Sequence, residues 1–182
     1  MSDRATLVQL LHQRSLQSGD FRLASGARSS YYIDARPTTM SAVGQRVIGR
    51  LGLAAIRDAG WDPAAIGGLT MGADPVAYAV ARASTDDPPT IDAFSVRHRV
   101  KDHGAGRLIE GNFAPGMAVV VAEDVVTSGG SAQRAIEAVT GAGGTVLGVL
   151  CVVDRLQGGR EVLKRAGYEV VSLASTNDLG LS

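Results

Sequence analysis

The stretch VAEDVVTSGGSAQRA, residues 121–135, is the part of the chain that decides the predicted fold. It joins an apolar run, residues 117–122, to two adjacent carboxylates, Glu123 and Asp124, and then to a loop of threonine, serine and glycine. The apolar run predicts a buried strand, and residues 131–140 predict a helix. Because carboxylates are rarely buried without a partner, a pair of them at the end of a buried strand indicates that something binds there.

Strand and helix signals alternate on both sides of this stretch. Short apolar runs predict strands, and periodic apolar positions or cap residues predict helices. The predicted strands are residues 64–69, 91–96, 117–122, 145–153 and 169–173, and the predicted helices are residues 41–59, 131–140 and 160–166, with a further helix capped by Asp74 and starting at Pro75. The alternation predicts the α/β class, a mostly parallel sheet flanked by helices. In such sheets ligands bind beyond the carboxyl ends of the strands.

The beginning of the chain follows a different pattern. Ser2 or Asp3 can cap a first helix, and FRLASGARSSYYID, residues 21–34, predicts two short strands around a turn. A second irregular segment, RHRVKDHGAGRLIEG at residues 97–111, is polar, basic and rich in glycine. It predicts a long mobile loop.

Length and charge set further limits. The 182 residues suit a single domain, which we expect to consist of a helix and hairpin hood, about residues 1–40, and an α/β core, about residues 41–182. The formal net charge is zero. Non-specific nucleic-acid binding usually requires a basic excess, so we expect no nucleic-acid partner.

The single cysteine, Cys151, lies inside the apolar run of residues 146–153. This position predicts a reduced thiol in the core of a cytoplasmic protein. One cysteine and three scattered histidines do not form a zinc site. The first residues carry charges throughout, unlike a signal peptide, and no apolar run is long enough to span a membrane.

The TSGGS loop, residues 127–131, has the properties of an anion site. It connects a strand to a helix, whose first turn leaves backbone N–H groups free, and glycine lets the loop approach a ligand closely. The lysine of a Walker loop and the dinucleotide pattern G-x-G-x-x-G are both absent. A sugar phosphate fits best, because Glu123 and Asp124 can then accept hydrogen bonds from ribose hydroxyls. The alternative to a ligand site is that Glu123 and Asp124 are simply the solvated end of a strand, followed by a helix cap.

The segment VVVAEDVVTSGGS, residues 119–131, resembles the 5-phosphoribosyl pyrophosphate (PRPP) binding motif of type I phosphoribosyltransferases. Three more segments narrow the resemblance to the orotate phosphoribosyltransferase family. Residues 21–34 are similar to its amino-terminal signature, RHRVKDHG at residues 97–104 is similar to its mobile catalytic loop, and VVDR at residues 152–155 is similar to the strand end where the family places an arginine near orotate. The resemblance covers about residues 7–173 in the family's order.

This resemblance implies the reaction of orotate with PRPP to give orotidine 5′-monophosphate and pyrophosphate, in the de novo biosynthesis of pyrimidines (UMP). It also implies a cytoplasmic homodimer in which the mobile loop of one subunit reaches the site of its neighbour, with Mg²⁺ as the cofactor. Mg²⁺ prefers oxygen ligands and keeps several waters. We therefore expect it to be held by PRPP and by waters near Glu123 and Asp124, with no direct protein ligand.

The implied site residues fall into three roles. Because cleavage builds positive charge on the ribose and negative charge on pyrophosphate, fixed opposite charges should lower the barrier. The expected catalytic residues are Lys101, Arg97, His103 and Asp124. The expected PRPP-binding residues are Thr70, Met71, Gly72, Ala73, Arg97, His98, Lys101, His103, Glu123, Asp124, Val125, Val126, Thr127, Ser128, Gly129, Gly130 and Ser131. The expected orotate-binding residues are Thr127, Arg155, Tyr32 and Ile33.

Simpler interpretations remain open for several of these residues. The basic loop can be a solvated surface segment, and residues 70–73 can be an ordinary turn before a helix capped by Asp74. Arg155 can form a surface ion pair with a neighbour such as Asp154. Tyr32 and its neighbour can simply pack in the hairpin.

At three positions the chain departs from the family pattern. Ala24, Gly72 and His98 stand where many family members have lysine, so individual contacts with PRPP or orotate are in doubt. A histidine is only partly charged near neutrality. We predict that PRPP binds more tightly as the pH falls from 8 to 6 and His98 becomes protonated. Binding constants measured at both pH values test this, and equal constants would contradict it.

Three other functions are alternatives to the transfer of phosphoribose to orotate. A phosphoribosyltransferase for another base differs only in the base pocket, so purine bases in the same assay separate the two. A PRPP-sensing regulator that binds nucleic acid is disfavoured by the zero net charge, the absence of an added helix-turn-helix segment and the retained loop around Lys101. One half of a bifunctional pyrimidine enzyme would need the second activity on a separate chain, because 182 residues are too few for both.

Overall fold

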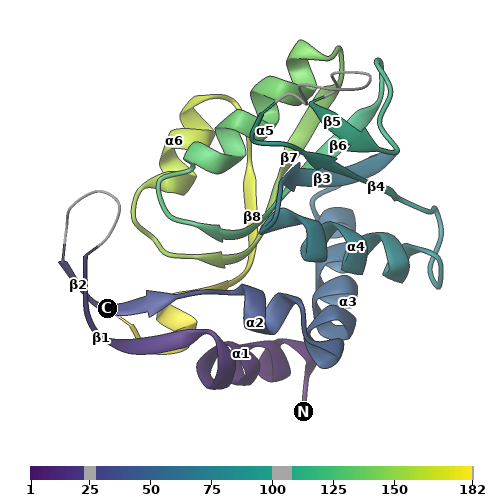
Figure 1. Cartoon of the computed structure of the whole chain (residues 1–182). Coiled ribbons are helices and arrows are strands. Elements are labelled where there is room, and N and C mark those ends of the chain that lie inside the picture. Colours follow the sequence, from purple (N-terminus) through teal and green to yellow (C-terminus); the bar gives the residue numbers. More distant parts are fainter. Residues whose placement is uncertain (23–27, 100–107, 182) are drawn as a thin grey trace.

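The computed structural model describes residues 1–22, 28–99 and 108–181. Its strands form a two-stranded hairpin and a six-stranded sheet with the order β5-β4-β3-β6-β7-β8 (Figure 1). The hairpin strands are β1 (Leu16–Arg22) and β2 (Arg28–Ile33), and the sheet strands are β3 (Ala65–Leu69), β4 (Asp92–Val96), β5 (Ile109–Gly111), β6 (Ala118–Val126), β7 (Thr145–Asp154) and β8 (Val170–Ser175). Every pairing in the sheet is parallel except that of β4 with β5. The expected α/β class is confirmed.

Helices cover both faces of this sheet (Figure 1). They are α1 (Asp3–Arg14), α2 (Arg36–Thr39), α3 (Ala42–Asp58), α4 (Ala73–Ser84), α5 (Gly130–Gly141), α6 (Gly159–Arg165) and the 3-10 helix η1 (Asn177–Leu179). Helices α1, α3 and α4 pack on one face, and α5 and α6 pack on the other. This arrangement follows from right-handed crossovers between parallel strands.

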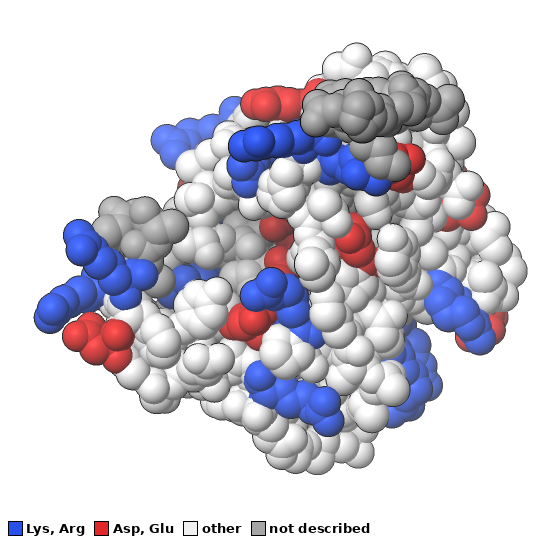
Figure 2. All heavy atoms as spheres, viewed as in Figure 1, with Lys and Arg blue, Asp and Glu red and all other residues white. Residues whose placement is uncertain are grey.

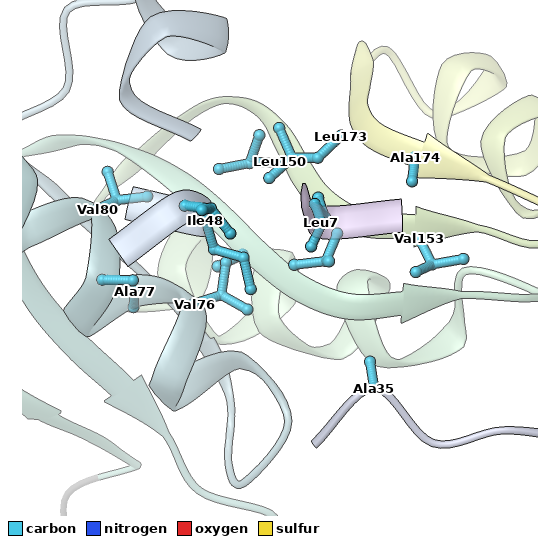
Figure 3. Packing of buried hydrophobic residues seen from close by; sticks show 14 of the residues in the cluster. Leu7, Ala35, Ile48, Val76, Ala77, Val80, Leu150, Val153, Leu173 and Ala174 are labelled. Atoms are coloured by element: carbon cyan, nitrogen blue, oxygen red, sulfur yellow. The ribbon is translucent and has the colours of Figure 1, made fainter. Parts of the chain in front are cut away.

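The core has two layers because alternate residues of a strand point to opposite faces. In β6, Val120 contributes to the layer under α3 and α4, whereas Val121 contributes to the layer under α5. Figure 3 shows the first layer, in which Leu7 of α1 and Ile48 of α3 lie near side chains of β7 and β8. The helix α1 thereby fixes the hood to the sheet.

Serine caps hold α1 and α3: the cap of α1 is one of the two predicted, and Ser41, predicted as the first residue of its helix, caps α3. Ser2 Oγ accepts a hydrogen bond from the Ala5 N–H at 3.2 Å, and Ser41 Oγ accepts one from the Gly44 N–H at 3.0 Å. The hairpin predicted within residues 21–34 is present as an antiparallel pair, although its first strand starts earlier, at Leu16. The short α2, which contains Pro37, was not predicted.

Three predicted boundaries are wrong. Strand β6 does not stop at residue 122 but continues to Val126, because β7 offers parallel pairing partners as far as Asp154. The end of the segment predicted as a loop forms β5, which pairs with β4. Helix α4 is not capped by Asp74 and starts two residues earlier than the predicted Pro75, at Ala73 after Gly72, and no side chain caps it.

Trp61, the only tryptophan of the chain, follows α3 and packs against β7. Its ring lies so close to Gly148 that a Cβ atom built there would be 2.2 Å from the indole Cζ2. In the following strand segment Cys151 is fully buried and free, in agreement with the sequence-based prediction of a core thiol. Within the described ranges, none of the helices has the length and apolar character needed to cross a membrane.

Candidate active site

A pocket of about 360 Å³ lies where the strand order reverses, between the carboxyl ends of β3 and β6. Ligands of open α/β sheets typically bind at such a point. The pocket is lined by Tyr32, Ile33, Asp34, Arg36, Leu69, Thr70, Met71, Gly72, His98, Glu123, Asp124, Val125, Thr127, Ser131 and Arg155. Acidic and basic side chains lie together around the hollow in the centre of the face shown in Figure 2. Residues from the hairpin, the turn after β3, the end of β6 and the end of β7 thus line one pocket, although they are far apart in the sequence.

Glu123 is the most deeply buried acid of this pocket, with 5% of its surface exposed. Its Oε1 atom has no hydrogen-bond partner in the described structure. Burial, and then the neighbouring Asp124 carboxylate, raise the pKa of Glu123 to about 8, although Arg134 opposes the shift. Without a ligand, Glu123 is therefore mostly protonated near neutral pH and is available to share a proton with a bound hydroxyl.

Asp124 is the next residue of β6 and is only partly buried. Burial raises its pKa as well, but the hydrogen bond that its Oδ1 accepts from the Val125 N–H at 2.9 Å works against this shift. Asp124 thus has a backbone donor for one carboxylate oxygen, whereas Oε1 of Glu123 has no hydrogen-bond partner in the described structure.

The TSGGS loop encloses a second, smaller cavity of about 110 Å³. Gly129 has a φ of +82°, a conformation that favours glycine, and no side chain caps α5 there. The cavity is lined by Glu123, Val125, Val126, Thr127, Ser128, Gly129, Gly130, Ser131 and Ala132. Gly159 supports the loop from behind, since a Cβ atom there would be 2.6 Å from the Thr127 carbonyl oxygen. An uncapped helix start beside a tight, supported loop is a typical phosphate site.

Arg155 is buried at the end of β7, with 6% of its surface exposed. Its Nε and Nη2 atoms have no hydrogen-bond partners in the described structure. The guanidinium lies over the ring of Tyr31, 5.1 Å from the ring centre. The alternative of a surface pair with Asp154 is wrong, because Asp154 binds Arg160 at 2.7 Å. A buried cation without a hydrogen-bonding anion indicates a ligand with negative charge.

Two charged residues of the pocket were missed by the sequence analysis. Arg36 makes a bidentate pair with Asp34, at 2.8 Å from Nε to Oδ1 and 2.9 Å from Nη2 to Oδ2. The hydrogen bond from Arg36 is the main reason why the pKa of Asp34 is lowered. Asp34 and Arg36 are the first and third residues after β2, which ends at Ile33, and two charges at a strand end were the available signal. Tyr31, whose ring lies under the Arg155 guanidinium, was not predicted either, whereas the predicted Tyr32 lines the pocket.

The turn between β3 and α4 is fixed by Asp74. Its carboxylate accepts hydrogen bonds from Thr70 Oγ1 at 2.6 Å and from Ser95 Oγ at 2.7 Å. The peptide bond between Thr70 and Met71 is cis. Asp74 thus holds the loop that faces Asp124, although it does not cap the helix.

Two other expected site residues, Ala73 and Arg97, are not part of the pocket lining. Ala73 is buried behind the loop, and Arg97 is paired with Glu110 of β5 at 3.1 Å. The expected catalytic residues Lys101 and His103, and the departure at Ala24, lie outside the described residues. Across the described ranges, no three His, Cys, Asp or Glu side chains come together as a metal site.

Comparisons with known proteins agree with this geometry. The family model of the phosphoribosyl transferase domain matches residues 42–173. The orotate phosphoribosyltransferase of Rhodopirellula baltica is 42% identical over 183 residues, covering 98% of this chain and 95% of the relative. A crystal structure of the Mycobacterium tuberculosis orotate phosphoribosyltransferase in complex with PRPP has a TM-score of 0.83 at 40% identity, covering 98% of this chain and 99% of the other.

Proposed function

Because the chain belongs to the phosphoribosyl transferase family and is an orotate phosphoribosyltransferase, we propose that PRPP and orotate meet in the pocket between β3 and β6. In this reaction the bond between ribose C1 and pyrophosphate breaks and a nitrogen of orotate takes its place. The observation that carries the proposal is the buried, unpartnered guanidinium of Arg155 in the same pocket as the acids of β6. A phosphate loop alone would suit many ligands, whereas Arg155 adds a site for a planar carboxylate.

Each part of PRPP has a matching part of the pocket. We propose that the TSGGS loop binds the 5′-phosphate, with backbone N–H groups at the start of α5 as donors. Glu123 and Asp124 would then lie beside the ribose hydroxyls, and the backbone of residues 70–73 would face pyrophosphate. Orotate would fill the space towards Arg155, Tyr32 and Ile33. The hood, about residues 1–40, closes this side, since residues 32–36 belong to the pocket wall.

Mg²⁺ is compatible with the residues present. The partly buried carboxylate of Asp124 and the unpartnered Oε1 of Glu123 lie in the same pocket, but they are too few to enclose an ion by themselves. We propose that Mg²⁺ is held mainly by PRPP and by waters near these two acids. When bound, it would neutralise part of the charge of the leaving pyrophosphate.

We also propose a homodimer in which the loop carrying Lys101 serves the site of the neighbouring subunit. A dimer is supported by two exposed apolar side chains, since Met71 of the pocket wall is 58% exposed and Tyr78 of α4 is 51% exposed. Large exposed apolar side chains commonly mark protein interfaces. A cytoplasmic location is proposed from the free and fully buried Cys151.

Replacing Lys101 with alanine should slow the conversion of orotate by about a hundredfold, because a charge that stabilises the leaving group is lost. The assay follows the ultraviolet absorbance of orotate in the presence of PRPP and Mg²⁺. Lys164→Ala, an exposed lysine of α6, is the matched control and should leave the rate unchanged. If adenine, guanine or hypoxanthine is consumed while orotate is not, the base assignment is wrong.

Mixing two inactive variants tests the shared loop. Lys101→Ala subunits lack the loop lysine, and Asp124→Asn subunits lack the acid of the pocket. If the loop acts across a dimer, random re-association should restore roughly a quarter of the wild-type activity, because half of the dimers then contain one intact site. If the loop acts within its own subunit, mixing should restore nothing.

A further inference from the structure

Gly72 is unusual among the glycines of the site because its backbone does not require glycine. Its φ and ψ angles are −63° and −42°, which any residue adopts. Gly129, in contrast, has a positive φ. The absence of a side chain at position 72 therefore needs a different explanation.

The space that a side chain at position 72 would occupy is filled by Asp124. A Cβ atom built on Gly72 would be 2.5 Å from Asp124 Oδ1, 2.8 Å from Cγ and 2.9 Å from Oδ2. All three separations are below 3.0 Å, so the carboxylate would have to move. The whole carboxylate, and not one atom of it, rests against the loop backbone.

Asp124 cannot move without loss. The oxygen nearest to the added Cβ atom, Oδ1, is also the one that accepts the hydrogen bond from the Val125 N–H. Rotating the carboxylate away from position 72 breaks this bond, which opposes the rise that burial causes in the pKa of Asp124.

We propose that Gly72 is the positioning residue for Asp124: the bare loop backbone at Gly72 holds the Asp124 carboxylate in the orientation that receives the ribose hydroxyls of PRPP. This inference rests on the proposed function, in which PRPP occupies this pocket. In this chain, any side chain at position 72 competes with Asp124 for one space.

For the PRPP affinity of variants at position 72, this inference predicts the opposite of what charge alone predicts. A lysine in place of Gly72 adds a positive charge beside the pyrophosphate site, and electrostatics predict tighter binding of PRPP. We expect instead that Gly72→Ala and Gly72→Lys both weaken PRPP binding, by about tenfold, since each displaces a hydrogen-bonding carboxylate. Isothermal titration calorimetry with PRPP and Mg²⁺ measures this directly and requires no turnover.

A double-mutant cycle separates positioning from a merely structural role. If Gly72 acts through Asp124, Gly72→Ala should weaken binding in the wild-type chain but add nothing to Asp124→Ala. Gly141→Ala, at the open end of α5 with no atom within 4 Å of the new Cβ, is the control and should leave binding unchanged. Melting temperatures of all variants reveal any general loss of stability.

Two results would overturn the inference. One is unchanged or tighter PRPP binding by Gly72→Lys. The other is full additivity in the cycle, in which the double variant Gly72→Ala/Asp124→Ala loses PRPP affinity by the product of the two single-variant factors. The proposed function has a separate test in the orotate assay. If orotate is not consumed but PRPP binds and the cycle shows the expected coupling, the function is wrong and the role of Gly72 stands.

Discussion

Replacing Arg155 with alanine should lower kcat/KM for orotate by about a thousandfold, because the variant loses a buried charged contact with the substrate carboxylate. PRPP binding should stay within about twofold of the wild-type value, since the phosphate loop and the acids of β6 do not contact this guanidinium. Steady-state kinetics with orotate and calorimetry with PRPP measure the two quantities separately. Uracil, which lacks the carboxylate, should be used equally poorly by both proteins.

The controls for this prediction separate binding from stability. Arg155→Lys keeps the charge but lacks the guanidinium fork, so it should recover only part of the loss. Arg165→Ala removes an exposed arginine of α6 and should change neither constant. Because Arg155 is a buried cation with unsatisfied nitrogens, alanine should not lower the melting temperature. A large fall in melting temperature with unchanged orotate kinetics would show that the residue is structural.

Glu123→Gln should stabilise the substrate-free protein at alkaline pH, by several kcal/mol at pH 9. The pKa of this carboxyl is raised from 4.5 to about 8 on folding. Below pH 4.5 the carboxyl is protonated in both the folded and the unfolded state, and its ionisation does not affect stability. As the pH rises from 4.5 towards 8, ionisation of the carboxyl lowers the free energy of the unfolded state but not that of the folded state, so the protein becomes less stable. The total loss is roughly 5 kcal/mol, and glutamine avoids it.

Chemical denaturation at pH values from 5 to 9 measures this effect. The difference in unfolding free energy between Glu123→Gln and wild type should be small at pH 5 and should grow up to about pH 8. Glu137→Gln, an exposed glutamate of α5, should show no such trend. A difference that stays constant with pH would mean that Glu123 ionises normally in the folded protein.

The sequence predicted the sheet and its helices because each element has its own local signal. Apolar runs predicted β3 and β7, and the helix predicted from Ser41 corresponds to α3, which Ser41 caps. Boundaries that depend on a partner strand were not predictable in this way. Residues 123–126 carry two acids and look like a strand end, yet they remain in β6 because β7 continues beside them. The three residues of β5 have no periodic signal and form a strand only through β4.

In the candidate site, too, features with a local sequence signal were predicted and features that depend on the fold were not. The TSGGS loop and the acids before it were identified from the sequence, and they border the same pocket. Arg155 was indicated only by resemblance to a family, because its burial and its missing hydrogen-bond partners cannot be seen in a sequence. Tyr32 was predicted and lines the pocket, whereas Tyr31, which contacts the Arg155 guanidinium, was not predicted. Neighbouring residues of a strand point to opposite sides, so the contacts of each tyrosine depend on how the hairpin lies.

The position of Trp61 makes the chain convenient for spectroscopy. Its indole packs on Gly148, six residues before Asp154 at the carboxyl end of β7, which corresponds to about 20 Å along the strand. The only tryptophan emission of the protein therefore arises near the amino-terminal half of the sheet, away from the pocket. We expect its intensity to follow the unfolding of the core and not the filling of the site, so that fluorescence can compare the unfolding of the variants above with or without substrate.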